Sequence, residues 1–164
     1  MGRDRLSRGA EVGETCNFTT LDGTQVLYLD RVEAQWPLRL TLDVGSHVPL
    51  HCTASGKLFL AHMAVAERDA LIGALALTRM TRQTITTAKA LKAECEAIAR
   101  SDHSCDHEEF IAGLIAVAVP VRDEAGRVRA AIALHAPTAR MSLAEAQRQL
   151  PALRAAAGRM GRLL

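Results

Sequence analysis

The sequence predicts an α+β domain in which helices pack on a mostly antiparallel sheet. Short apolar runs separated by turn residues occur near both ends of the chain, and helical patterns lie between them and at the C-terminus. Hydrophobic residues make up 49% of the 164 residues, which is enough for one buried core. Strands at both ends of a helical middle are typical of the α+β class.

The N-terminal part predicts a β-hairpin followed by a third strand. Two short apolar runs, Thr15–Leu21 and Gln25–Arg31, flank the dipeptide Asp22-Gly23, which favours a tight hairpin turn. Leu38–Val44 then alternates apolar with polar residues, as a strand with one buried face does. We therefore expect three strands before residue 46.

The middle of the chain predicts three helices. Apolar residues recur at helical spacing in Gly56–Met63, Glu67–Leu77 and Thr86–Arg100. The hydroxyl of Thr86 or Thr87 can cap the third helix, because a threonine oxygen accepts a hydrogen bond from an unpaired amide of the first turn.

A second hairpin and a C-terminal helix complete the chain. The unbroken apolar run Leu114–Val121 indicates a strand buried on both faces, Asp123–Gly126 turns the chain, and Arg127–His135 returns beside it. Ser142–Glu145 has the pattern of a capping box at a helix start. Pro151 should kink or restart that helix, because proline removes an amide donor.

Charge and composition exclude several classes of protein. Lysine and arginine number 20 against 18 acidic residues, and aromatic residues make up 3%, so the chain lacks the basic and aromatic character of a nucleic-acid binder. The four cysteines form no Cys-x-x-Cys pair, and no apolar run approaches the roughly 20 residues of a membrane helix. We expect reduced thiols, a cytoplasmic location and no membrane partner.

Three enzyme-like patterns are weak. Gly56-Lys57 lacks the upstream glycine and the following Ser or Thr of a phosphate loop. Cys52 and His51 are neighbours that point in opposite directions on an extended chain, and Glu108 and Glu109 are adjacent carboxylates without a visible nucleophile. We expect no catalytic residues and no cofactor.

A metal site is the alternative left open by one segment. Asp102–Glu109 is dense in histidine, cysteine and carboxylate side chains, all of which suit zinc, but no pair has a spacing that by itself encodes a site. A polar turn before a buried strand is the simpler interpretation, and we assign no metal ligands.

Five groups of residues, taken in order along the chain, resemble the C-terminal effector-binding domain of IclR-type bacterial transcription regulators. The resemblance extends from about residue 12 to the end, and five motifs in register make it specific. The residues that carry it are Gly13-Glu14-Thr15, Leu29–Glu33, Val44–Lys57, Thr84-Ile85-Thr86, and Asp106–Gly113 with Val119–Asp123.

The resemblance implies a GAF-like fold, with a curved, mostly antiparallel sheet flanked by helices around a pocket for small metabolites. It also implies homodimers or tetramers, and DNA binding through an N-terminal winged helix-turn-helix domain. Residues 1–11 are too short to be such a domain. We therefore expect residues 1–11 to be a remnant or linker and residues 12–164 to be the effector-binding domain.

The family's pocket can be carried onto this sequence residue by residue. Relatives that bind small oxoacids hold the carboxylate on backbone amides that match Ala54 and Ser55, at a helix start where unpaired amides favour an anion. Their acidic pocket residue matches Asp106. The positions that hold a cysteine and two serines in those relatives are Ala116, Ala133 and His135 here.

These differences predict a changed ligand. Two methyl groups and an imidazole replace three polar contacts, so we expect a larger and more apolar acid, such as an aromatic one, in place of a two- or three-carbon oxoacid. His135 should face inward with Ala131 and Ala133, either to pair with the ligand or to be satisfied by a carbonyl or by Asp106.

Two other functions are kept as alternatives to the sensor. One is a metal-dependent enzyme built around Asp106, His107 and His135. The other is an interaction module that kept the fold and lost its effector.

Overall fold

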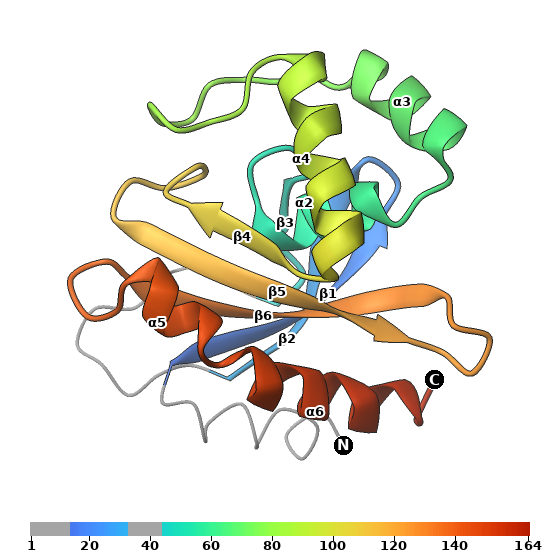
Figure 1. The fold of residues 1–164 in the computed structure, drawn as a ribbon, viewed down its shortest axis with the longest axis vertical. Helices are drawn as coiled ribbons and strands as arrows, with labels where there is room; N and C mark the ends of the chain where they lie inside the picture. The colour runs from blue at the N-terminus through green and yellow to red at the C-terminus, as the bar shows by residue number, and fades with distance from the viewer. Residues whose placement is uncertain (1–13, 33–43) are drawn as a thin grey trace.

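The computed structural model describes residues 14–32 and 44–164, which form a six-stranded sheet with helices on both faces (Figure 1). The strand order is β3-β2-β1-β6-β5-β4, and each neighbouring pair is antiparallel. The predicted α+β class is confirmed. The strands are β1 (Thr15–Asp22), β2 (Gln25–Val32), β3 (His47–Pro49), β4 (Ser104–His107), β5 (Leu114–Arg122) and β6 (Val128–Pro137).

Both predicted hairpins are confirmed. β1 pairs with β2 across Gly23, and β5 pairs with β6 across Gly126; both glycines have a positive φ, of 61° and 79°. Such a φ favours glycine because a side chain would be strained there. The predicted strand Leu38–Val44 lies outside the described residues except for Val44, which is in a turn before β3.

The three predicted helices of the middle are present with shifted ends. The first begins earlier than expected because Thr53, not a later residue, caps it: the Thr53 Oγ1 accepts a hydrogen bond from the Gly56 amide. Thr87 caps the third helix in the same way, as expected. The helices are α2 (Ala54–Ala61), α3 (Val65–Ala74), α4 (Ala88–Ser101), α5 (Leu143–Gln147) and α6 (Leu150–Gly161).

The C-terminal helical segment is divided in two. Ser142 and Glu145 form the predicted capping box at the start of α5, and Pro151 lies in the first turn of α6, where its missing amide costs no helical hydrogen bond. Proline therefore restarts the helix, one of the two outcomes that the sequence allowed.

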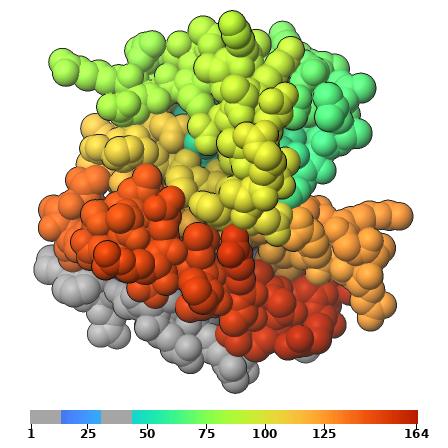
Figure 2. All heavy atoms as spheres, in the orientation of Figure 1, coloured from blue at the N-terminus to red at the C-terminus, as the bar shows by residue number. Residues whose placement is uncertain are grey.

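Two layers of helices cover the sheet. α2, α3 and α4 lie on one face, which we call the inner face, and α5 and α6 lie on the other (Figure 1). In the space-filling view the end of α4 meets α6 (Figure 2). There Arg154 of α6 donates a hydrogen bond to the Ser101 carbonyl at 3.1 Å. Both faces of the central strands are therefore buried.

Among the described residues, none of the helices has the length and apolar character that crossing a membrane requires.

Candidate functional site

The start of α2 is buried against the inner face of the sheet. Every residue of α2 is buried, and Ala54 and Ser55 are its first two residues, directly after the Thr53 cap. Amides of a first helical turn have no acceptor within the helix and lie at the positive end of its dipole. The two residues predicted to hold a carboxylate thus lie where backbone donors are available.

Gly56 allows the first turn of α2 to lie close to the backbone of Leu50. A Cβ atom at residue 56 would collide with the backbone of Leu50, so only glycine lets the first turn of α2 lie against that segment. Thr53 Oγ1 fixes the same turn from the other side, because it also donates to the Pro49 carbonyl at 2.7 Å.

Three of the other predicted site residues lie in one row across the sheet. Asp106 on β4 is directly opposite Ala116 on β5, and Ala116 is directly opposite His135 on β6. Residues directly opposite in antiparallel strands share a face. In the next row, Ala133 lies opposite both Ala118 and Asn17. The structure therefore brings Asp106, Ala116, Ala133 and His135 together on the inner face.

His135 faces inward with Ala131 and Ala133, as expected, but its partner was not predicted. Asn17 Nδ2 lies 2.8 Å from His135 Nδ1. With the amide nitrogen donating, Nδ1 of the ring is the acceptor. The side chain of His135 is thus oriented by β1 and not by Asp106.

Asp106 is a buried carboxyl group. It is 2% exposed, and burial raises its pKa to about 7, with the charge of Glu109 acting in the same direction and Lys57 opposing. Its Oδ1 accepts a hydrogen bond from the Glu109 amide at 2.7 Å. Near neutral pH this group is therefore balanced between its neutral and charged forms.

Four buried side-chain oxygens have no hydrogen-bond partner among the residues that the structure describes. All four residues are at most 3% exposed, and Asn17, Thr19 and Ser104 lie opposite inner-face alanines. Buried polar atoms are normally paired, because each unpaired one costs about 1–3 kcal/mol. The four atoms are Asn17 Oδ1, Thr19 Oγ1, Ser55 Oγ and Ser104 Oγ.

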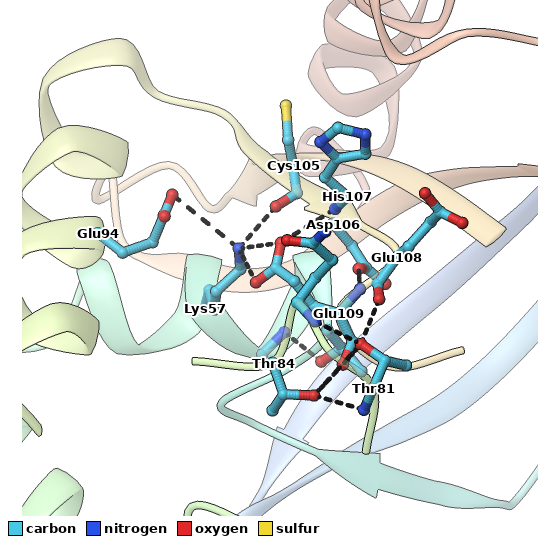
Figure 3. A network of polar contacts seen from close by, with 12 residues as sticks. Lys57, Thr81, Thr84, Glu94, Cys105, Asp106, His107, Glu108 and Glu109 are labelled. Atoms are coloured by element: carbon cyan, nitrogen blue, oxygen red, sulfur yellow. Dashed lines mark hydrogen bonds and ion pairs between the residues drawn. The ribbon is translucent and has the colours of Figure 1, made fainter. Parts of the chain in front are cut away.

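A buried ion pair supports the segment that carries Asp106. Lys57 Nζ donates to both carboxylate oxygens of Glu109, at 2.8 and 3.0 Å, and to the Cys105 carbonyl at 2.6 Å (Figure 3). Glu94 of α4 lies on the other side of the ammonium group, at 4.0 Å. Lys57 therefore joins α2 to β4 and to the turn after it.

The same turn is held by threonines from the loop before α4. The Thr84 hydroxyl donates to the Glu109 carbonyl at 2.7 Å, and the Thr81 hydroxyl donates to the Glu108 carbonyl (Figure 3). Glu108 has a φ of 57°, and its Oε1 accepts from the Gly113 amide at 2.8 Å. Both glutamates therefore have structural partners within the domain.

The segment Asp102–Glu109 is more than the polar turn before a buried strand that the sequence suggested. Ser104–His107 forms the short strand β4, and Asp102 caps the end of α4, where it binds Arg122 at 2.7 and 2.8 Å. Within residues 14–32 and 44–164, no group of three or more histidine, cysteine, aspartate or glutamate side chains is arranged to hold a metal ion.

The cysteine thiols are not activated. Cys52 is buried, and burial, with Asp106 and Glu109 adding to it, raises its pKa to about 12. A thiolate is the nucleophilic form, so such a thiol is inert near neutral pH. The His51 ring is occupied elsewhere, with its Nε2 2.8 Å from the Thr78 carbonyl oxygen.

Comparison with known proteins identifies the family. The family described as "Bacterial transcriptional regulator IclR C-terminal" matches residues 4–162. The chain belongs to the IclR family. It is the effector-binding domain of a transcriptional regulator, as the sequence motifs predicted, and the relatives below are named as transcriptional regulators.

Two curated IclR-family relatives illustrate the similarity. The protein named "Probable transcriptional regulator SauR" from Cupriavidus necator is 49% identical over 92% of this chain and 60% of its own length. The HTH-type transcriptional regulator BhcR of Paracoccus denitrificans is 34% identical over 85% of this chain and 50% of its own length. The chain thus spans between half and three fifths of these two relatives.

Solved structures of the family have the same fold. The IclR protein of Thermotoga maritima superposes with a TM-score of 0.90 at 28% identity, covering 99% of this chain and 68% of that one. The inducer-binding domain of an Acinetobacter PobR double mutant, in complex with 3-hydroxybenzoic acid, has a TM-score of 0.90 at 27% identity and covers 99% of this chain and 97% of that one.

The sequence alone did not point to several residues of this candidate site. Asn17 and Thr19 alternate with Cys16 and Phe18 on β1, a pattern that also fits a strand with one face in water. The sequence signal that could have identified them is the alternation of polar and apolar residues on β1, a strand that pairs with the largely apolar β6. The pairing of Lys57 with Glu109 joins residues 52 positions apart and has no local signal.

Proposed function

We propose that this domain binds a small carboxylic acid between the start of α2 and the inner face of the sheet. The carboxylate would accept hydrogen bonds from the amides of Ala54 and Ser55, while Asp106, Ala116, Ala133 and His135 would contact the rest of the molecule. The observation that carries the proposal is the buried Ser55 Oγ, which has no partner among the described residues and lies in the first turn of α2. A ligand carboxylate supplies the acceptor that this hydroxyl and the adjacent amides lack.

The ligand is larger than glyoxylate or pyruvate. Ala116 and Ala133 offer methyl groups, and His135 offers an imidazole oriented by Asn17, so the proposed floor has an apolar centre with polar groups at its edge. An aromatic acid fits that distribution, because a ring covers the methyl groups while its carboxylate reaches the helix start. The complex of the PobR domain with 3-hydroxybenzoic acid supports this ligand class.

Binding assays on the 164-residue chain test the proposal. Calorimetry with glyoxylate, pyruvate, benzoate and 3-hydroxybenzoate should give the tightest binding for an aromatic acid. Preferential binding of the smallest oxoacids would contradict the proposed size, and failure of all acids would favour the interaction module.

A pair of histidine variants tests the site. His135→Ala should weaken aromatic-acid binding at least tenfold, since it removes a buried ring from the proposed floor. His107→Ala is the matched control, because His107 is exposed and should leave the affinity unchanged. Equal affinities for both variants would remove His135 from the site.

Effector binding would act through self-association. A ligand that binds one arrangement of protomers better than another shifts their populations by its differential affinity. In a longer chain with a DNA-binding domain, that shift would reposition the domains that contact DNA. Homodimers or tetramers are the expected assemblies.

A further inference from the structure

Asn17 and Thr19 are polar side chains on a buried face of a strand. Thr19 is 0% and Asn17 is 3% exposed, and Asn17 Oδ1 and Thr19 Oγ1 have no partner among the described residues. The neighbouring Thr20 differs, since its hydroxyl donates to the Arg129 carbonyl at 3.0 Å. Two unsatisfied groups two residues apart are costly for the fold, so a function is needed to explain them.

Both residues adjoin the proposed effector site. Asn17 is directly opposite Ala133, and Thr19 is directly opposite Ala131, so both share the inner face with these alanines. Asn17 also contacts His135 through its amide nitrogen. That contact uses the Asn17 Nδ2 donor. The Asn17 Oδ1 acceptor is therefore available to a different partner.

We propose that Asn17 and Thr19 recognise a hydroxyl group on the effector, which is therefore a hydroxylated acid. This inference rests on the proposed function. Asn17 Oδ1 can only accept a hydrogen bond, whereas the Thr19 hydroxyl can donate or accept. A ligand hydroxyl donates to Asn17 and accepts from Thr19 at once. A second carboxylate has no proton for Asn17 Oδ1, and an apolar group would leave both atoms unpaired.

Matched pairs of acids test the recognition. Calorimetry on the 164-residue chain would compare benzoate with 3- and 4-hydroxybenzoate. At least one hydroxylated acid should bind about tenfold or more tightly than its parent, because a buried polar site discriminates against a ligand that leaves it unpaired. Thr19→Val should remove that preference, and Thr20→Val should keep it. A preference that survives in Thr19→Val would overturn the proposal.

A second measurement needs no ligand. Thr19→Val replaces an unpaired buried hydroxyl with a methyl of the same shape, so thermal unfolding of the ligand-free chain should move up by about 2–4 °C. Thr20→Val removes a satisfied hydroxyl and should lower the unfolding temperature. A fall for Thr19→Val like that for Thr20→Val would mean that Thr19 has a structural partner, and the inference would fail.

The two proposals fail in different ways. Acids that bind without any preference for a hydroxyl overturn the role of Asn17 and Thr19 and leave the proposed function intact. Absence of binding by every acid in the set overturns both.

Discussion

The Lys57–Glu109 pair shows at the scale of single residues how the site is supported. The lysine side chain is 1% and the glutamate 9% exposed, so each charge depends on the other for compensation. The backbone amide of Glu109 in turn donates a hydrogen bond to Asp106 Oδ1. Removing one charge should therefore affect both the fold and the proposed site.

Lys57→Met should lower the free energy of unfolding by about 3–5 kcal/mol, because it leaves the Glu109 carboxylate buried without a counter-charge. Lys57→Met/Glu109→Gln should recover part of the loss, since neither charge then remains. Urea denaturation measures the free energy of unfolding of the single and the double variant. Lys89→Met, on the exposed face of α4, is the control and should change this free energy little. A double variant as unstable as Lys57→Met alone would contradict the pairing.

Asp106 gives the domain a pH dependence of defined sign. Its pKa in the fold is about 7 against an ordinary value of 3.8, so between these values the folded chain holds a proton that the unfolded chain has released. The stability conferred by this group is thus fully present below about pH 4 and is lost as pH rises to about 7. Between about pH 4 and 7 the free energy of unfolding should fall by roughly 2–4 kcal/mol more than that of Asp106→Asn, whose side chain cannot ionise. Urea denaturation of both chains across this range measures it, and parallel curves would show that Asp106 titrates normally.

At the scale of elements, the position of α2 depends on a glycine. Gly56→Ala should destabilise the chain by about 1–3 kcal/mol, because its Cβ would push the first turn of α2 away from Leu50. Gly73→Ala is the matched control: it lies in helix α3 with open space around it and should be neutral or stabilising by up to about 1 kcal/mol. Thermal unfolding compares them, and equal effects would mean that the α2 start is not tightly packed.

The elements also show what local sequence can and cannot predict. Both hairpins and the α5 capping box follow from turn and cap residues a few positions apart, and they were predicted. α3 stops at Ala74 although helix-forming residues continue, because in the extended segment after it Leu75 and Leu77 can both pack against the core. β4 was missed because its four residues carry no apolar alternation and are held as a strand by β5.

The residues of the candidate site also divide into those that the sequence could predict and those that it could not. Asp106, Ala116 and His135 could be placed on one face through the family motifs, since a strand register carries over between relatives. Asn17 and Thr19 could not, because a polar face of β1 is buried only once α2, far along the chain, packs over the sheet. Burial by a distant element is a tertiary effect that strand alternation does not encode.

At the scale of the whole molecule, helices cover both faces of the central strands, and any signal from the inner face must leave the domain through its outer surfaces. Inward residues such as Ala133 are 0% exposed, so a ligand there touches neither a partner protomer nor DNA directly. An effector can therefore influence assembly only by changing how the helices and loops around it are held.

The proposed coupling of effector binding to assembly has a reciprocal consequence that can be measured. If effector binding favours one oligomeric state, self-association must change effector affinity by the same factor. The dissociation constant of the acid should therefore differ at least fivefold between protein concentrations below and above the self-association midpoint, a factor at the lower end of typical coupling. Sedimentation velocity locates the midpoint, and titrations on either side of it give the two constants. The Thr20→Val chain, altered outside the proposed site, should show the same ratio. Identical constants at both concentrations would uncouple effector binding from assembly and leave acid binding itself unaffected.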